Sequence, residues 1–139
     1  MGRSPQGGEM KRILMILIII ILTGCTSVSG LKSTPASGQK VETSKELEEV
    51  VRISLEALLD IGMEIQTNEQ ISEGEVVIVG LKRISLMTNG ELIKIHIQTE
   101  GGKILVYVDG HSRDKTQITG TLRAQKYEKN IINYLEGSL

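Results

Sequence analysis

The chain contains few residues that could crosslink it or stack against a partner. Its 139 residues include one cysteine, two prolines and three tyrosines, and neither tryptophan nor phenylalanine. A single thiol excludes an intramolecular disulfide. The scarcity of aromatic rings and a formal net charge of −1 argue against nucleic-acid binding, which uses a basic face and stacking side chains. We therefore expect no nucleic-acid partner and an aliphatic core that is stabilised by packing alone.

The one long hydrophobic run lies near the N-terminus. Lys11 and Arg12 precede ten apolar residues, 13–22, which end at Thr23. A basic start, a short apolar run and a small-residue boundary are typical of a secretory signal. The run has about half of the roughly 20 apolar residues that a membrane-spanning helix needs, and it lacks the polar side chains of an amphipathic core helix. The segment is therefore predicted to be a signal peptide.

The end of this segment, Leu22-Thr23-Gly24-Cys25, resembles the lipobox of bacterial lipoproteins. The resemblance implies that the Cys25 sulfur takes a diacylglycerol, that the chain is cut between Gly24 and Cys25, and that the new N-terminus is often acylated as well, palmitate being a typical acyl group. A diacyl anchor holds a protein on a membrane durably, at about 0.8 kcal/mol per buried methylene. Cys25 is thus the predicted lipidation site.

The lipid anchor predicts a location in the cell envelope. In an organism with one membrane, the protein is expected on the outer leaflet of the cell membrane. In an organism with two membranes, the resemblance implies the periplasmic face of the outer membrane, because Thr26 rather than an aspartate follows Cys25. The membrane is therefore the first predicted partner.

The start of translation is open to a second interpretation. Residues 2–9 have no signal character, whereas Met10 begins a normal lipoprotein signal. The Gly-Gly-Glu sequence at residues 7–9 can be encoded by a ribosome-binding site. We therefore hypothesise that translation starts at Met10 rather than at Met1.

The composition divides the chain into three regions. Residues 1–24 are the signal peptide, and residues 25–42 are rich in Ser, Thr, Gly and Pro without a hydrophobic period, which predicts a flexible tether. Residues 43–139 are predicted to form one small domain. Loss of residues 1–24 removes three basic and one acidic side chain, so the mature chain is about three charges negative.

The hydrophobic periods predict two helices and four strands. A capping box at residues 43–46 starts a helix that ends near Asp60, and a second helix runs from about Thr121 to a C-cap at Gly137. Residues 68–74 are expected to form a turn, and Asn89-Gly90 and Gly101-Gly102 two tight hairpins. The strands are expected over residues 61–66, 76 to 84 or 86 with a bulge at Gly80, 92–98 and 104–108, with a short edge pairing at 117–119.

This order, α-β-β-β-β-α, predicts an α+β domain of two layers. Both helices pack on one face of a four-stranded antiparallel sheet, and the other face, which carries Lys94, His96 and Gln98, is expected to be wet. Helix 43–60 and the two hairpins resemble a group of short bacterial lipoproteins of unknown function. That resemblance implies a small envelope domain and transfers no functional residue.

The only cluster of site-like side chains lies at Asp109, His111, Ser112 and Asp114. Ligands to a metal must converge on one point, which a single turn rarely achieves. The neighbouring side chains His111 and Ser112 point apart, so they make a poor nucleophile and base. The segment is therefore interpreted as a solvated connection, and no catalytic residue, metal site or cofactor is predicted.

Three functions remain open. The one we favour is an interaction module for an unidentified envelope protein, which binds at an exposed strand edge marked by Ile118 or Ile84. The alternative is a carrier of a small ligand or lipid, which needs a cavity for which about 95 folded residues leave little room. A hydrolase would need the His111 turn to meet a distant group, such as a carboxylate from residues 64–75. The expected protein is a lipid-anchored envelope lipoprotein without catalysis.

Overall fold

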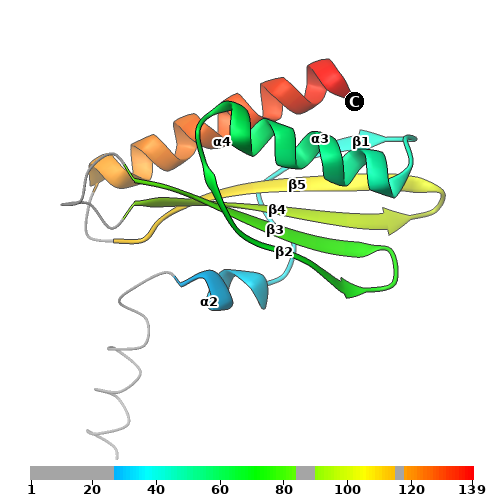
Figure 1. The fold of residues 1–139 in the computed structure, drawn as a ribbon, viewed down its shortest axis with the longest axis horizontal. Coiled ribbons are helices and arrows are strands. Elements are labelled where there is room, and N and C mark those ends of the chain that lie inside the picture. The colour runs from blue at the N-terminus through cyan, green and yellow to red at the C-terminus, as the bar shows by residue number, and fades with distance from the viewer. Residues whose placement is uncertain (1–26, 84–89, 115–117) are drawn as a thin grey trace, which may run out of the picture.

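The computed structural model describes residues 27–83, 90–114 and 118–139. These residues form three helices and five strands (Figure 1). The helices are α2 (Val28–Lys32), α3 (Leu47–Asp60) and α4 (Ile118–Ser138). The strands are β1 (Gln39–Thr43), β2 (Glu64–Ser72), β3 (Glu75–Lys82), β4 (Glu91–Glu100) and β5 (Lys103–Ser112). The class is α+β, as the sequence predicts.

All five strands belong to one antiparallel sheet, in the order β1-β5-β4-β3-β2. Strands β2 to β5 form the predicted meander, with Ile95 of β4 paired to Ile78 of β3 and to Val108 of β5. The prediction of four strands and two helices is wrong, because β1 adds a strand beside β5 and α2 adds a helix among the described residues.

Both added elements come from the segment that was expected to be a tether. Residues 28–32 form α2, and residues 39–43 pair along their whole length with β5. Each element has only one buried apolar side chain, Leu31 in α2 and Val41 in β1. A single buried residue makes no period, so the sequence pattern cannot reveal elements that are held by backbone pairing and by contacts to distant strands.

The first face of the sheet carries α3 and α4 (Figure 1). Alternate side chains of β3, β4 and β5 point to this face, and most of them are aliphatic. Their packing with the two helices buries the main core, which includes Val50, Leu58, Ile78, Ile93, Ile95, Ile97, Val106, Val108, Ile131 and Leu135. Glu91 at the start of β4 is also buried here and pairs with Arg123 of α4 at 2.6 Å. This face agrees with the layer that the sequence predicts.

The second face of the sheet is covered by α2, which lies on the opposite side from α3 and α4 (Figure 1). Leu31 packs there against a smaller apolar cluster of Val77, Val79, Leu81 and Leu92. Further along the same face, Lys94 is 1% exposed and His96 is 3% exposed. The expectation of a wet face is therefore wrong, because the chain before residue 39 folds back over it.

The start of α3 differs from the predicted capping box. Glu46 is the N-cap residue, and its side chain makes no capping hydrogen bond. The Thr43 hydroxyl accepts a hydrogen bond from the Lys45 backbone N–H instead, because Thr43 belongs to β1. The helix still ends at Asp60, as predicted.

Two further segments adopt a different structure from the predicted one. Residues 68–72, expected to be a turn, continue β2 to the edge of the sheet, where polar side chains face solvent without cost. Ile118, expected to mark an edge strand, lies in the first turn of α4 and is 79% exposed. Gly137 lies within α4 rather than at its C-cap.

Strand β2 is an open edge of the sheet, and it is bulged twice. The register with β3 shifts between Ile65 and Thr67 and again between Gln70 and Ser72. The sequence places a bulge at Gly80 of β3, whereas the extra residue is on β2 opposite that glycine. A bulge bends and twists its strand, so β2 does not present a flat edge.

The second predicted hairpin is confirmed. Gly101 and Gly102 both have positive φ angles, 59° and 78°, and join β4 to β5 between the paired residues Glu100 and Lys103. Of the first hairpin, Gly90 has a φ of 88°, and its partner Asn89 lies outside the described residues.

The predicted signal peptide, with its cleavage and lipidation site at Gly24 and Cys25, also lies outside the described residues, as does Ile84.

Gly38→Ala should destabilise the protein strongly. Gly38 has a φ of 94°, and a Cβ atom there would lie 2.1 Å from the Val108 carbonyl oxygen. We expect a loss of about 1–2 kcal/mol from the backbone conformation and about 1–3 kcal/mol more from the overlap, measured by urea unfolding. Gly101→Ala is the matched control, because its φ of 59° is also positive but no atom lies within 4 Å of the added Cβ. Equal losses in the two variants would contradict the close packing of residue 38 on β5.

Candidate functional site

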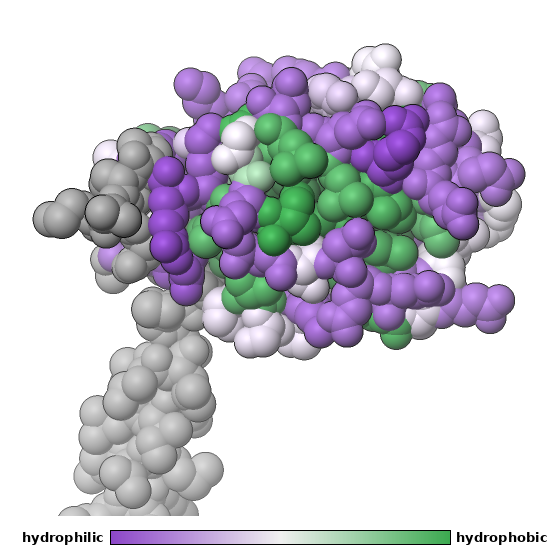
Figure 2. All heavy atoms as spheres, in the orientation of Figure 1, coloured by the Kyte–Doolittle hydropathy of each residue, from purple (hydrophilic) through white to green (hydrophobic). Residues whose placement is uncertain are grey.

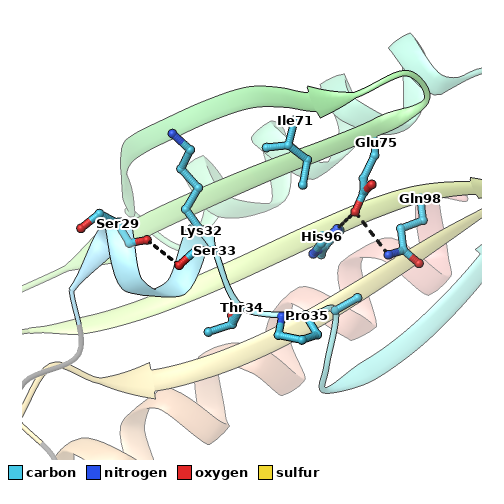
Figure 3. A pocket seen from close by; sticks show the side chains of 10 residues that line it. Ser29, Lys32, Ser33, Thr34, Pro35, Ile71, Glu75, His96 and Gln98 are labelled. Atoms are coloured by element: carbon cyan, nitrogen blue, oxygen red, sulfur yellow. Dashed lines mark hydrogen bonds and ion pairs between the residues drawn. The ribbon is translucent and has the colours of Figure 1, made fainter. Parts of the chain in front are cut away.

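A pocket of about 680 Å³ opens on the second face of the sheet (Figure 3). Its floor comes from β4, one wall from α2 and the chain that follows it, and the other wall from the β2–β3 hairpin. The lining residues are Ser29, Lys32, Ser33, Thr34, Pro35, Ala36, Ile71, Glu75, His96 and Gln98.

Strand geometry brings the polar floor together. His96 and Gln98 are two residues apart on β4, so both side chains point to the same face. Glu75 begins β3 and pairs in register with Gln98, which places its carboxylate beside both of them. The three side chains therefore form one polar group, although they are separate in the sequence.

The wall is fixed by the end of α2. Ser27 caps the start of the helix by accepting a hydrogen bond from the Gly30 N–H at 3.0 Å. The Thr34 hydroxyl donates to the Leu31 carbonyl at 2.7 Å, and the chain then continues through Pro35, which has no N–H to extend the helix. The helix therefore stops after one turn, and the chain after it crosses the sheet.

The side chains of Glu75 and His96 are in contact on the pocket floor. The His96 Nε2 atom contacts the Glu75 Oε1 atom. Among the described residues, the buried His96 Nδ1 atom has no hydrogen-bond partner. The contact between Nε2 and the carboxylate oxygen places a proton on Nε2, which is donated to Glu75.

Glu75 is held in its ionised form. The hydrogen bond from His96 is the largest cause that lowers the pKa of Glu75, and the Ser72 hydroxyl adds a second bond at 2.8 Å, while burial acts in the opposite direction. The Gln98 amide donates a third bond, at 3.4 Å. The floor of the pocket therefore carries an ionised carboxylate.

Lys94 fastens the wall to the sheet. Its ammonium donates to the Thr34 carbonyl at 2.7 Å, to the Thr34 hydroxyl at 2.8 Å and to the Pro35 carbonyl at 3.4 Å. Burial lowers the pKa of Lys94, and the negative charges of Asp109 and Glu75 oppose that shift. Burying a cation is costly unless hydrogen bonds compensate for the water it loses. The bonds from the Lys94 ammonium to residues 34 and 35 are charge-assisted and therefore strong.

The predicted cluster around His111 lies in and just after β5 rather than in a loop. The His111 Nε2 atom is 2.8 Å from Asp109 Oδ2, and the Ser37 hydroxyl donates to the same oxygen at 2.6 Å. The hydrogen bond with His111 is the largest cause that lowers the pKa of Asp109. Asp109 therefore ties the chain at residue 37 to β5, next to the start of β1.

This arrangement does not match a nucleophile with a base. The serine proton is donated to a carboxylate and not to an imidazole, and the Ser112 hydroxyl donates to the Asp114 backbone oxygen at 2.8 Å. The distant carboxylate that approaches is Glu128 of α4, which accepts from the Gly110 N–H at 3.0 Å and whose pKa is raised mainly by burial. Of the carboxylates in residues 64–75, Glu75 contacts His96 and Glu69 pairs with Lys32 instead of joining the cluster.

Within residues 27–83, 90–114 and 118–139, no group of three His, Cys, Asp or Glu side chains is placed to hold a metal ion. In the same residues, no helix has the length and hydrophobicity needed to cross a bilayer.

The sequence pattern does not predict the pocket. Lys94, His96 and Gln98 alternate with isoleucines on β4, which predicts a solvated face. Their burial depends on residues 28–36, which are about 60 positions away and have no hydrophobic period. The one hint is that lysine and histidine sit in the middle strand of a meander, where neighbours on both sides restrict access to water.

Comparison with known proteins gives no family for this chain. No family model and no curated protein matches it. Among solved structures, it is similar to the crystal structure of the vertebrate conserved region of human METTL16, with 17% sequence identity and a TM-score of 0.42. The match covers 76% of this chain and 84% of that one.

Lys94→Met should change how stability depends on alkaline pH. The folded protein binds the Lys94 proton less tightly than the unfolded chain does, so the free energy of unfolding should rise as the pH increases from the lowered pKa to the ordinary value of 10.5. The variant should lose this rise, as measured by urea unfolding at a series of pH values. Lys103→Met, whose side chain is 65% exposed, should keep it. The same alkaline rise in Lys94→Met would contradict the burial of this cation.

Proposed function

We propose that this protein is a lipid-anchored, ligand-binding protein of the cell envelope. Acylated Cys25 holds it on the membrane, and the pocket of the second sheet face binds a small molecule. The proposal combines the lipobox resemblance of residues 22–25 with the position of the pocket, whose wall begins a few residues after Cys25.

The pocket is the observation that carries the binding role. Its volume of about 680 Å³ is within the ~300–1,000 Å³ that is usual for small-molecule sites. It combines apolar walls from Ile71 and Pro35 with a few fixed polar groups, which is the composition such sites use. A domain of about 95 residues has room for this pocket because the pocket lies between the sheet and residues 29–36 and takes no volume from the main core.

A second candidate function is the interaction module. A groove of about 320 Å³ separates α3 from β2, lined by Leu47, Glu48, Val51, Asn68, Gln70 and Val76. Figure 2 shows hydrophobic side chains exposed across the middle of the face that carries these elements, with hydrophilic ones around them. An exposed hydrophobic area with a polar rim is typical of a protein-binding surface.

Cys25→Ala should abolish lipidation. Without the thiol there is no acceptor for the diacylglycerol, so the precursor should stay uncleaved and retain its signal peptide in the membrane. The measurement is incorporation of labelled palmitate, together with the mass of the purified chain. Ser27→Ala, close in sequence but without a thiol to lose, should be labelled and cleaved like the wild type. Labelled and processed Cys25→Ala protein would show that the anchor is elsewhere.

One preparation separates the two candidate functions. A photo-crosslinking side chain at Glu48, which is exposed in the α3–β2 groove, is compared with one at Glu56, which is exposed on the same helix outside it. After crosslinking in intact envelopes, the protein is analysed by native mass spectrometry. We expect a non-covalent small molecule on the chain and the same crosslinks at both positions. A discrete protein captured only at Glu48, with no small molecule bound, would replace the pocket by the interaction module.

A further inference from the structure

The pocket lies close to the predicted anchor, and this restricts what can occupy it. The argument in this subsection rests on the proposed acylation of Cys25. Ser29, in the pocket wall, is four residues after Cys25, so their Cα atoms are within about 14 Å of each other whatever path the chain takes. The headgroup layer on each side of a bilayer is roughly 5–7 Å thick. Lipid headgroups are therefore the molecules nearest to the pocket.

The floor of the pocket calls for a cationic group. Glu75 is ionised and accepts hydrogen bonds from His96 and Gln98, and the Lys94 ammonium is already bonded to Thr34 and Pro35. The Glu75 side chain is still 28% exposed, so a ligand can reach it. An ammonium group with N–H donors would offset the charge and add charge-assisted hydrogen bonds.

The other side of the pocket can take an anion. Lys32 is paired with Glu69, but both side chains are exposed, at 36% and 48%. An exposed pair of this kind contributes little, so the lysine can exchange its carboxylate for another anion at small cost. In Figure 3, Lys32 and Glu75 stand on either side of Ile71, so the cation and anion sites are separated across the pocket.

Ile71 adds the third feature. It lies on β2 between the two charged side chains and is 40% exposed, although it is a large apolar residue. A solvent-exposed isoleucine at the pocket suits a ligand whose polar head continues into an apolar body. An ammonium, a phosphate and an adjoining apolar part together describe one class of lipid.

We propose that the pocket binds the phosphoethanolamine headgroup of a membrane lipid, with the ammonium on Glu75 and the phosphate on Lys32. The headgroup enters from the bilayer to which the protein is anchored. The free compound has the same chemistry, so the experiment must distinguish the two sources.

The test uses the mature, acylated protein that begins at Cys25, in nanodiscs of phosphatidylglycerol, a lipid that lacks an amine. Labelled O-phosphoethanolamine should bind, and O-phosphocholine, which has no N–H donor, should bind more weakly. Glu75→Gln should weaken binding by at least about tenfold, the loss expected for one charge-assisted hydrogen bond. Glu42→Gln is the matched control, because Glu42 is an exposed strand glutamate outside this pocket, and its affinity should stay within about twofold of the wild type.

A second arm identifies the source of the ligand. In nanodiscs that contain phosphatidylethanolamine, the lipid should occupy the pocket and prevent binding of the labelled compound. Undiminished binding there would assign the site to a soluble amine and overturn the lipid proposal. No binding in either bilayer, or equal binding by Glu75→Gln, would overturn the headgroup chemistry. Palmitate labelling of the same preparation shows separately whether the anchor, and with it the proposed function, is present.

Discussion

The second face of the sheet depends on the burial of one charge. Residues 33–38 have almost no apolar side chains with which to hold themselves on a sheet, and the Lys94 ammonium supplies the attachment through the oxygens of Thr34 and Pro35. Because this attachment holds the chain across the sheet, α2 can place Leu31 on the smaller cluster, and β1 is delivered to the edge of β5. The same path covers His96 and forms a wall of the pocket.

The two faces of one sheet thus solve the packing problem differently. The face under α3 and α4 is mainly aliphatic, with one buried ion pair between Glu91 and Arg123, and its stability comes chiefly from the area of apolar surface that it buries. The face under α2 contains Lys94, Glu75, His96 and Asp109, each with a defined partner. Space remains between residues 29–36 and the sheet on this face, and the pocket lies there. A second, polar layer therefore lets a small domain keep its core full and still offer a binding site.

The sequence predicts what repeats locally and misses what depends on distant contacts. The C-terminal end of α3 near Asp60, the meander and the Gly101-Gly102 turn follow from periodicity and from turn chemistry, and the structure has all three. In contrast, α2 and β1 have one buried apolar residue each, so the sequence contains no hydrophobic period from which they could be predicted. The burial of His96 could not be predicted for the same reason: alternation states which face a side chain is on, but not whether another segment covers that face. Asp109 and His111 lie on β5 and not in the predicted solvated connection, and the Ser37 hydroxyl that donates to Asp109 comes from 72 positions away.

The bulges of β2 affect how copies of the protein interact when many of them share one surface. On a membrane, where the proposed anchor would hold this protein, copies would meet more often than in free solution and in a restricted range of orientations. An unpaired edge strand can then form backbone hydrogen bonds with the edge strand of another copy. The register shifts after Ile65 and Gln70 interrupt the row of N–H and C=O groups that such a neighbour would need. The bulges in β2 therefore disfavour edge-to-edge pairing between copies of the protein.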